Sequence, residues 1–436
     1  MFINKSRLSS LVFLTGVVLA AAFATLLDKS DQYSSFQTRE NLFVKDTSFI
    51  APLSPRSLTS DDLSAARRAW HYFELNTRES GLVDSVSGFP STTLWDQGSY
   101  IFAIIAANNL GIIDNGTAIG RANKLLSSFR KIELYDETLP NKAYNTETLD
   151  KTDYANNSLE VGIGWSALDL ARFLLALRAL ERHAPELSSN IVQMITNWNL
   201  EAFANSGELW GMVDNGIDRS IVQEGRLGYE QYGARAVALW GLDVSTAITA
   251  TRVLSWRKVE GVLIPTDTRT AQTHSAVTPI LSEPFLLQAL EMGLDHESSI
   301  FASQIYLAQL NRFERTTIPT FVSEDHLDRP PNFAYSSVFS NDETWAVVSE
   351  TGEQFNQLRS LSTKAVFGWD ALYGTSYTNQ MRNKLKALPD EGQGWQAGIY
   401  EATSEPNSVY SLNTNAVILE AIYYKAFGPI LAMARK

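Results

Sequence analysis

The stretch Ala167-Leu-Asp-Leu-Ala-Arg-Phe-Leu-Leu-Ala-Leu177 decides the fold class of this chain, because it is apolar on nearly every side of a helix. A helix without a polar face is buried by other helices. Four more segments have the same character: Tyr100–Ala107, Ala234–Trp240, Phe285–Leu290 and Ala416–Tyr423. The sequence therefore predicts several helices in the interior of one large helical domain.

A second kind of helix precedes these segments along the chain and has one polar face. Apolar residues recur at helical spacing from Leu63 to Phe73, and Ser60 is suited to cap the N-terminus of this helix. Similar apolar stripes run through residues 122–129, 191–198 and 301–308. A helix with one polar face lies on the outside of a domain.

Pairing each outer helix with the following inner helix predicts an all-α fold, an (α/α)6 toroid of about six helical hairpins. The predicted pairs are 60–110, 117–181, 187–240, 243–293, 295–374 and 378–427. Long loops precede the inner helices, at 77–93, 132–163, 205–227, 257–281, 314–341 and 389–411. If successive hairpins alternate in direction, these loops meet at one rim, where we expect a functional site.

The N-terminal segment has the pattern of an export signal. Lys5 and Arg7 precede an apolar run from Leu11 to Leu27, and Ala22-Phe23-Ala24 suits a signal-peptide cleavage site. Residues 8–27 are also long enough to cross a bilayer, so an uncleaved inner-membrane anchor is the alternative. Either reading predicts an exported, periplasmic or extracytoplasmic domain. The expected organisation is a signal peptide or anchor at 1–28, a polar linker at 29–58 and the toroid domain at 59–436.

Composition excludes several classes of function. The chain has 436 residues, with 48 acidic against 36 basic residues and a net charge of -12, which disfavours nucleic acid as a partner. The absence of cysteine excludes disulfides, thiolate catalysis and cysteine zinc sites, and the five histidines form no H-E-x-x-H motif. We therefore expect no metal centre and no cofactor, with carboxylate-bound calcium at Asp136-Glu137 or Glu324-Asp325 as an alternative.

Carboxylates and aromatic residues recur where the predicted inner helices begin. Examples are Leu94-Trp-Asp96, Gly164-Trp-Ser-Ala-Leu-Asp169 and Phe367-Gly-Trp-Asp370. Aromatic faces stack on sugar rings, carboxylates and amides bind sugar hydroxyls, and a carboxylate pair can hydrolyse a glycosidic bond. Any one of these residues could instead cap a helix or fill the core. Their recurrence at one predicted rim favours a sugar site.

Longer motifs resemble those of the bacterial domain-of-unknown-function 3131 (DUF3131) family. They are Glu224-Gly-Arg-Leu-Gly-Tyr-Glu-Gln-Tyr232, Gly394-Trp-Gln-Ala-Gly-Ile-Tyr-Glu401 and Asn413-Thr-Asn-Ala-Val-Ile-Leu-Glu420. The resemblance covers about residues 58–430. It implies a fold similar to the glucoamylase-like α/α toroid enzymes, which act on glucans or other polysaccharides, but it brings no established reaction.

We interpret the chain as an exported carbohydrate-active enzyme, a glycoside hydrolase whose partner is a neutral glucan or exopolysaccharide. Glu230 or Glu401 is the predicted general acid, because neighbouring tyrosines favour a raised pKa. Asp96, at a helix start, is the predicted base. The predicted substrate-binding residues are Trp95, Glu160, Trp165, Asp169, Glu224, Tyr229, Tyr232, Glu283, Glu324, Asp325, Trp369, Trp395, Asn413 and Asn415, with Glu343 as a further carboxylate in reserve.

Two other functions fit parts of the pattern. A polysaccharide lyase would neutralise a uronate with Arg219 and Arg226 beside Tyr229, although the net negative charge argues against an anionic substrate. A non-catalytic glycan-binding or envelope-polysaccharide assembly factor would keep the aromatic residues and need no acid–base pair.

Overall fold

The computed structural model describes residues 49–274 and 276–431. The predicted signal peptide or anchor and most of the predicted linker lie outside these residues. Within the described part, no helix is long and apolar enough to span a membrane. Residues 49–58, expected in the linker, pack on the domain instead: the Leu53 amide donates to the Leu372 carbonyl at 2.8 Å, and Arg56 Nη2 donates to the Asp370 carbonyl at 2.8 Å.

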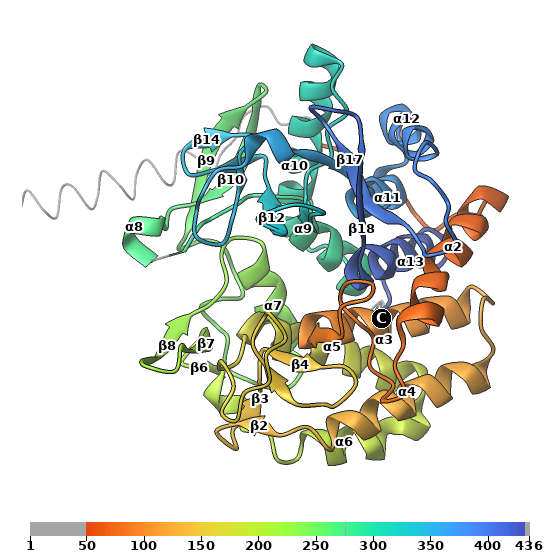
Figure 1. Cartoon of the computed structure of the whole chain (residues 1–436). Helices are drawn as coiled ribbons and strands as arrows, with labels where there is room; N and C mark the ends of the chain where they lie inside the picture. The colour runs from red at the N-terminus through yellow and green to blue at the C-terminus, as the bar shows by residue number, and fades with distance from the viewer. Residues whose placement is uncertain (1–48, 275, 432–436) are drawn as a thin grey trace, which may run out of the picture. The chain divides into compact units, whose positions relative to one another are not determined.

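Six helices form a closed cycle of contacts in which each helix packs on the next and the last packs on the first (Figure 1). Most of their side chains are buried; α11, for example, buries every residue from Thr363 to Tyr373. In chain order these inner helices are α3 (Leu94–Asn109), α5 (Ala167–His183), α7 (Tyr229–Ala238), α9 (Glu283–Leu287, extended by a π-turn at Gln288–Met292), α11 (Thr363–Tyr373) and α13 (Leu412–Phe427).

Five outer helices precede inner helices along the chain. Helix α2 packs on α13, α4 on α3, α6 on α5, α10 on α9 and α12 on α11. Their bounds are α2 (Ser60–Asn76), α4 (Asn115–Phe129), α6 (Ser188–Ile195), α10 (His296–Thr316) and α12 (Ser376–Leu385). A short further helix, α8, spans Ala271–His274.

The predicted fourth hairpin lacks its outer helix in the described residues. Residues 243–253 form turns, followed by the antiparallel strands β9 (Leu254–Val259) and β10 (Val262–Asp267), and β10 packs on α10. Serine and threonine are frequent here (Ser245, Thr246, Thr249, Thr251), and their hydroxyls compete with helical hydrogen bonds. The described domain is therefore mainly helical, and six complete hairpins are not present in it.

The all-α prediction also needs correction because the loops before the inner helices carry small antiparallel sheets. Hairpins satisfy backbone groups that these long excursions would otherwise leave unpaired. The three-stranded sheets are β1 (Ser91–Thr93) with β4 (Ala143–Asn145) and β5 (Lys151–Thr152); β6 (Ala204–Asn205) with β7 (Glu208–Asp214) and β8 (Arg219–Gln223); β11 (Glu324–His326) with β12 (Phe333–Ser336) and β15 (Val347–Val348); and β16 (Ser360–Ser362) with β17 (Gln396–Tyr400) and β18 (Pro406–Tyr410). Two further strand pairs are β2 (Leu134–Tyr135) with β3 (Leu139–Pro140), and β13 (Phe339–Ser340) with β14 (Glu343–Thr344).

Candidate active site

Acidic side chains from several inner helix starts interact with one another. Asp96 is the third residue of α3, Asp169 the third of α5, and Glu283 the first of α9. Strand β11 and the residue just after strand β8 supply the rest, and we call the whole set the carboxylate cluster: Asp96, Asp169, Glu224, Glu283, Glu324 and Asp325. Electrostatic coupling connects its members, because Asp96 and Glu224 act on Asp169 while Glu283 acts on Glu324 and Asp325.

Asp96 is held at the start of α3 by hydroxyl groups. Ser85 Oγ donates to its Oδ2 at 2.5 Å and Thr93 Oγ1 donates to the same oxygen at 3.0 Å. Thr93 also caps the helix, since its hydroxyl accepts the Asp96 amide at 3.2 Å. These hydrogen bonds hold the Asp96 carboxyl group in place at the N-terminus of α3.

Asp169 and Glu224 lie together at the start of α5. Glu224 accepts hydrogen bonds from Ser166 Oγ at 2.6 Å and from the Ala167 amide at 2.7 Å. A side chain at Gly211 would collide with the Glu224 carboxylate, so this approach requires glycine there. Burial, and then the charge of Glu224, raise the pKa of Asp169 to about 7.

Strand β11 carries three consecutive titratable residues, Glu324, Asp325 and His326. Because successive side chains on a strand point to opposite faces, Glu324 and His326 lie on one face and Asp325 lies on the other. Glu324 lies opposite Tyr335 and His326 opposite Phe333 on β12. Tyr229 Oη donates to Glu324 Oε2 at 2.5 Å. Burial, followed by the charge of Glu283, raises the pKa of Glu324 to about 8, so this half-buried carboxyl retains a proton at neutral pH.

Lys364, in the first turn of α11, places an ammonium group beside the carboxylate cluster. Its Nζ forms an ion pair with Glu283 and lies 3.9 Å from Asp325 Oδ1. Asn413 Nδ2, at the start of α13, donates to Glu283 Oε1 at 2.6 Å. Asp325 faces away from Glu324, and its burial raises its pKa to about 7. Glu283 therefore has full charge compensation, whereas Glu324 and Asp169 form no ion pair shorter than 4 Å with an amine or guanidinium in the described residues.

Trp95 packs between this cluster and the helical interior. Its ring lies 5.7 Å from that of Tyr229, and the Arg172 guanidinium lies 4.6 Å from its ring centroid. Arg172 is fully buried and pairs with Glu291 at 2.9 Å and Glu420 at 3.3 Å. Burial raises the pKa of Glu420 well above its ordinary value, and its hydrogen bond with Glu291 favours the protonated form.

Several residues near the cluster were missed by the sequence analysis. Tyr154 interacts with Asp169, and Tyr335 with Glu324 and Asp169. His326 interacts with Asp96, while burial lowers the pKa of the imidazole. The run Glu324-Asp325-His326 could have been noticed as three consecutive titratable residues. The tyrosines and Lys364 had no distinguishing pattern in the sequence.

The structure places Glu401 apart from the cluster, which corrects its assignment as an acid. Arg312 donates to both of its oxygens at 2.8 Å, and Arg359 Nε donates at 3.1 Å. Burial alone would raise the pKa of Glu401, but these hydrogen bonds and charges outweigh it and lower the pKa. A carboxylate held ionised by two guanidiniums is poorly suited to donate a proton.

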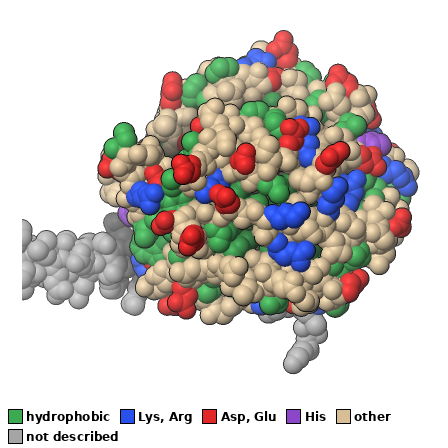
Figure 2. Space-filling view, turned by 60° about the horizontal axis from the view of Figure 1, so that its bottom comes forward, with side chains coloured by type: hydrophobic (Ala, Val, Ile, Leu, Met, Phe, Trp, Pro, Cys, Tyr) green, Lys and Arg blue, Asp and Glu red, His purple; other side chains and the backbone are tan. Residues whose placement is uncertain are grey.

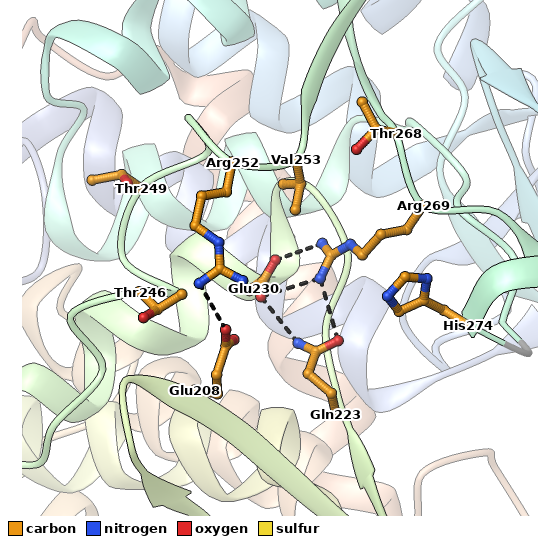
Figure 3. Close-up of a pocket in the computed structure, with 10 residues that line it drawn as sticks. All are labelled: Glu208, Gln223, Glu230, Thr246, Thr249, Arg252, Val253, Thr268, Arg269 and His274. Carbon is orange, nitrogen blue, oxygen red and sulfur yellow. Dashed lines mark hydrogen bonds and ion pairs between the residues drawn. The ribbon is translucent and has the colours of Figure 1, made fainter. Parts of the chain in front are cut away.

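Glu230, the other predicted acid, faces a separate pocket (Figure 3). Its Oε2 accepts from Arg269 Nη2 at 2.6 Å and its Oε1 accepts from Gln223 Nε2 at 3.0 Å. Burial raises its pKa, as predicted, while Arg269 opposes that rise. Its position beside Arg269 and outside the carboxylate cluster removes it from the reaction we derive below.

Most of the predicted sugar platforms are packed inside the domain. Trp369 is fully buried and donates to Ser282 Oγ at 3.0 Å, while Trp395 donates to the Ala65 carbonyl at 3.0 Å. The indole of Trp165 donates to the Trp210 carbonyl at 3.0 Å, and Tyr232 Oη donates to Glu291 at 2.5 Å. These four rings have no free face for a sugar and belong to the core.

Three polar predictions also change. Asn415 is buried and its Oδ1 accepts the Trp395 amide at 2.8 Å, so it shapes the loop rather than a binding surface. Glu160 is exposed at the end of a loop, and Glu343 accepts hydrogen bonds from Gln354 and Asn356. In the part of the chain that the structure describes, no group of three histidine or acidic residues is arranged to hold a metal ion.

Solved structures with the same fold come from several organisms. A glucoamylase-like protein from Bacteroides caccae has a TM-score of 0.64 at 14% identity, covering 86% of this chain and 95% of that chain. An endo-β-1,2-glucanase from Chitinophaga pinensis, in complex with sophorotriose and glucose, has a TM-score of 0.61 at 12% identity, covering 86% and 94%. An endo-β-1,2-glucanase from Talaromyces funiculosus, with sophorose, has a TM-score of 0.55 at 11% identity, covering 86% and 85%.

Identities this low establish a shared fold and no more. The sequence has no significant match among curated proteins. A family model for a protein of unknown function, DUF3131, matches residues 64–428. Since this match spans most of the chain, the chain belongs to the DUF3131 family.

Proposed function

We propose that this protein is a glycoside hydrolase that cleaves a neutral glucan at the carboxylate cluster. The observation that carries the proposal is the pairing of two kinds of carboxyl group in one place. Glu324 has a pKa raised to about 8 and can donate a proton, whereas Asp96 lies among hydroxyl donors at a helix N-terminus. Glycoside hydrolysis requires one carboxyl of each kind.

In the proposed reaction, Glu324 donates its proton to the glycosidic oxygen as the bond to the anomeric carbon breaks. Asp96 accepts a proton from the water that attacks that carbon, so one water is consumed for each bond cleaved. Tyr229 orients Glu324 through its 2.5 Å hydrogen bond, and Asp169, whose pKa is about 7, is the alternative proton donor. Trp95 and the exposed ring of Tyr154 provide aromatic surface for sugar stacking.

A neutral substrate follows from the charges of the site. Six carboxyl groups and the Lys364 ammonium meet here, and Lys364 is already paired with Glu283. Such a site repels a polyanion such as a uronate polymer. Figure 2 shows acidic and basic side chains interspersed on one face of the domain. The glucan ligands of the β-1,2-glucanases with this fold support a glucan, with β-1,2-glucan the first to test.

The proposal extends to architecture and location. We infer that the closed cycle of inner helices is the inner ring of an α/α toroid with one incomplete hairpin. Residues 1–28 would direct export, so the substrate would be met outside the cytoplasm.

The test uses the purified full-length protein with β-1,2-glucan, starch, other neutral glucans and uronate polysaccharides. Reducing ends report hydrolysis, and absorbance of unsaturated products reports lyase chemistry. We expect reducing ends from a neutral glucan only, lost in both Glu324→Gln and Asp96→Asn. Binding of glycans without cleavage by the wild type would favour the non-catalytic alternative. Unsaturated products from a uronate polymer would establish the lyase.

A further inference from the structure

A polar pocket lies beside the carboxylate cluster. Residues 223 and 224 separate the two: the Glu224 carboxylate binds the start of α5, whereas the Gln223 amide donates to Glu230 at 3.0 Å. The pocket has a volume of about 250 Å³ and takes its walls from β7, β8, α7, the 246–253 turns and the segment after β10. These turns stand where the predicted fourth outer helix is absent, so the missing helix leaves room for the pocket.

The charges that line this pocket are balanced. Arg252 lies 3.2 Å from Glu208, and Arg269 lies 2.6 Å from Glu230. Figure 3 shows both guanidinium groups pointing toward the Glu230 side of the pocket, with the His274 ring at its edge. Burial, together with the charges of Arg226 and Arg269, lowers the pKa of His274, so its imidazole is uncharged at neutral pH. The pocket therefore presents two carboxylates and two guanidiniums, with no excess of either sign.

The lining of the pocket contains both hydrogen-bond donors and hydrogen-bond acceptors. Carboxylates accept hydrogen bonds and guanidiniums donate them. The amide of Gln223 and the hydroxyls of the lining threonines can each donate and accept; these threonines are Thr246, Thr249 and Thr268. Adjacent hydroxyls of a sugar need this arrangement, because each hydroxyl donates one hydrogen bond and accepts others. An anion would face Glu208 and Glu230, and a cation would face Arg252 and Arg269. A neutral polyol meets neither repulsion.

The size and lining restrict the ligand further. A volume of about 250 Å³ equals roughly eight water molecules at ~30 Å³ each, which suits one sugar ring. Val253 is the only apolar residue in the lining, and no Phe, Tyr or Trp ring contributes, so a sugar would bind through its hydroxyl edge rather than by stacking. This contrasts with the aromatic surroundings of the carboxylate cluster.

We propose that this pocket, lined by Glu208, Gln223, Glu230, Arg252 and Arg269, is a second, non-catalytic binding site for a single neutral sugar unit. It holds either a free monosaccharide or one unit of a longer glycan. The inference does not depend on hydrolysis at the carboxylate cluster, because the pocket has its own charges and walls.

The test measures binding of D-glucose to the full-length protein by saturation-transfer NMR and calorimetry, with D-glucuronate and D-glucosamine as charged probes. Trp95→Ala removes one of the two aromatic rings proposed for sugar stacking at the carboxylate cluster, leaving that of Tyr154, and serves as the background. Into it we add Arg252→Met and Thr249→Val, two substitutions at exposed side chains that leave the buried Glu230–Arg269 pair intact. Equal melting temperatures of the two proteins confirm that folding is unchanged.

We expect the Trp95→Ala protein to bind glucose in the millimolar range and the triple variant to bind at least fivefold more weakly. Glucuronate and glucosamine should each bind more weakly than glucose. The proposal is overturned if Trp95→Ala abolishes glucose binding, if the triple variant binds as well as its background, or if either charged probe binds best. Hydrolysis is assayed separately with Glu324→Gln, so failure of the pocket and failure of the proposed reaction are distinguishable.

Discussion

Glu324, on strand β11, and Glu401, in the turn just after strand β17, both lie in loop segments that precede inner helices, yet their chemistry is opposite. Glu324 has carboxylates around it, and burial with the Glu283 charge raises its pKa to about 8. Glu401 lies between Arg312 and Arg359, which lower its pKa despite burial. The comparison shows that the cations nearest in space, not the neighbours in sequence, decide which carboxyl keeps a proton at neutral pH.

The largest expected effect is a difference in kcat between variants of Glu324 and Glu401. Glu324→Gln removes the proposed acid and should lower kcat by about 10²–10⁴-fold, the usual contribution of general acid catalysis. Glu401→Gln changes a carboxylate away from the cluster and should leave kcat within about threefold, as measured by reducing ends on the neutral glucan found active. Equal losses in the two variants, or an active Glu324→Gln enzyme, would contradict the comparison.

The second effect concerns the single cation of the cluster. Lys364→Met leaves the buried Glu283 and Asp325 without their ammonium partner, which should cost about 3 kcal/mol of unfolding free energy at pH 8. The loss should be smaller at pH 5, because the Asp325 carboxyl, whose pKa is raised to about 7, is protonated there. Denaturant unfolding at the two pH values measures it, with the exposed Lys384→Met as the matched control. A loss that is the same at both pH values would mean that Lys364 does not compensate these charges.

A third effect follows from the raised pKa of Asp169. The unfolded chain releases this proton near the ordinary value of 3.8 and the folded protein only near 7, so the ionised side chain lowers stability as the pH rises through that window. Asp169→Asn should therefore raise Tm by a few degrees at pH 8 and change it little at pH 4. Hydrogen bonds from Ser245 lower the pKa of Asp243, so Asp243→Asn should give no such gain. If Asp169→Asn is neutral at pH 8, its carboxyl is not destabilised in the folded state.

The smallest effect is a shift in the pH profile. Tyr229 donates a hydrogen bond that stabilises the ionised form of Glu324 and so lowers its pKa. Tyr229→Phe should move the alkaline limb of the kcat/KM profile to higher pH by less than about one unit. Tyr335→Phe, which leaves that hydrogen bond in place, is the control. An alkaline limb that stays in place or moves to lower pH would show that another group controls it.

The order of inner and outer helices was predictable because it depends on local hydrophobic patterning. A segment such as 167–177 must be buried on all sides, whichever helices surround it. The missing outer helix at 243–253 and the small sheets were not predictable in this way. Their short strands depend on hydrogen bonds to partners far along the chain, such as β1 with β4 and β16 with β17.

The sequence predicted where the polar residues of the candidate site lie along the chain, but not which side chains are buried and which face the site. Asp96, Asp169 and Glu283 all lie where helix-start patterns indicated, because a residue just inside a helix N-terminus is fixed by local geometry. Trp369 and Trp395 follow a similar pattern and are buried. Which face of a helix or loop a ring occupies depends on packing that local sequence does not contain.

The sequence by itself determined that this is a large, acidic, cysteine-free, mainly helical domain with carboxylates at the starts of its inner helices. These properties follow from composition and from the period of apolar residues, which act over one or two helical turns. The tertiary contacts, by contrast, account for the raised pKa of Glu324, for the two arginines that compensate the charge of Glu401, and for the place of Glu230 in a separate pocket. The physical reason is that burial and Coulomb interactions act between residues close in space, and the fold brings those residues together from distant parts of the chain.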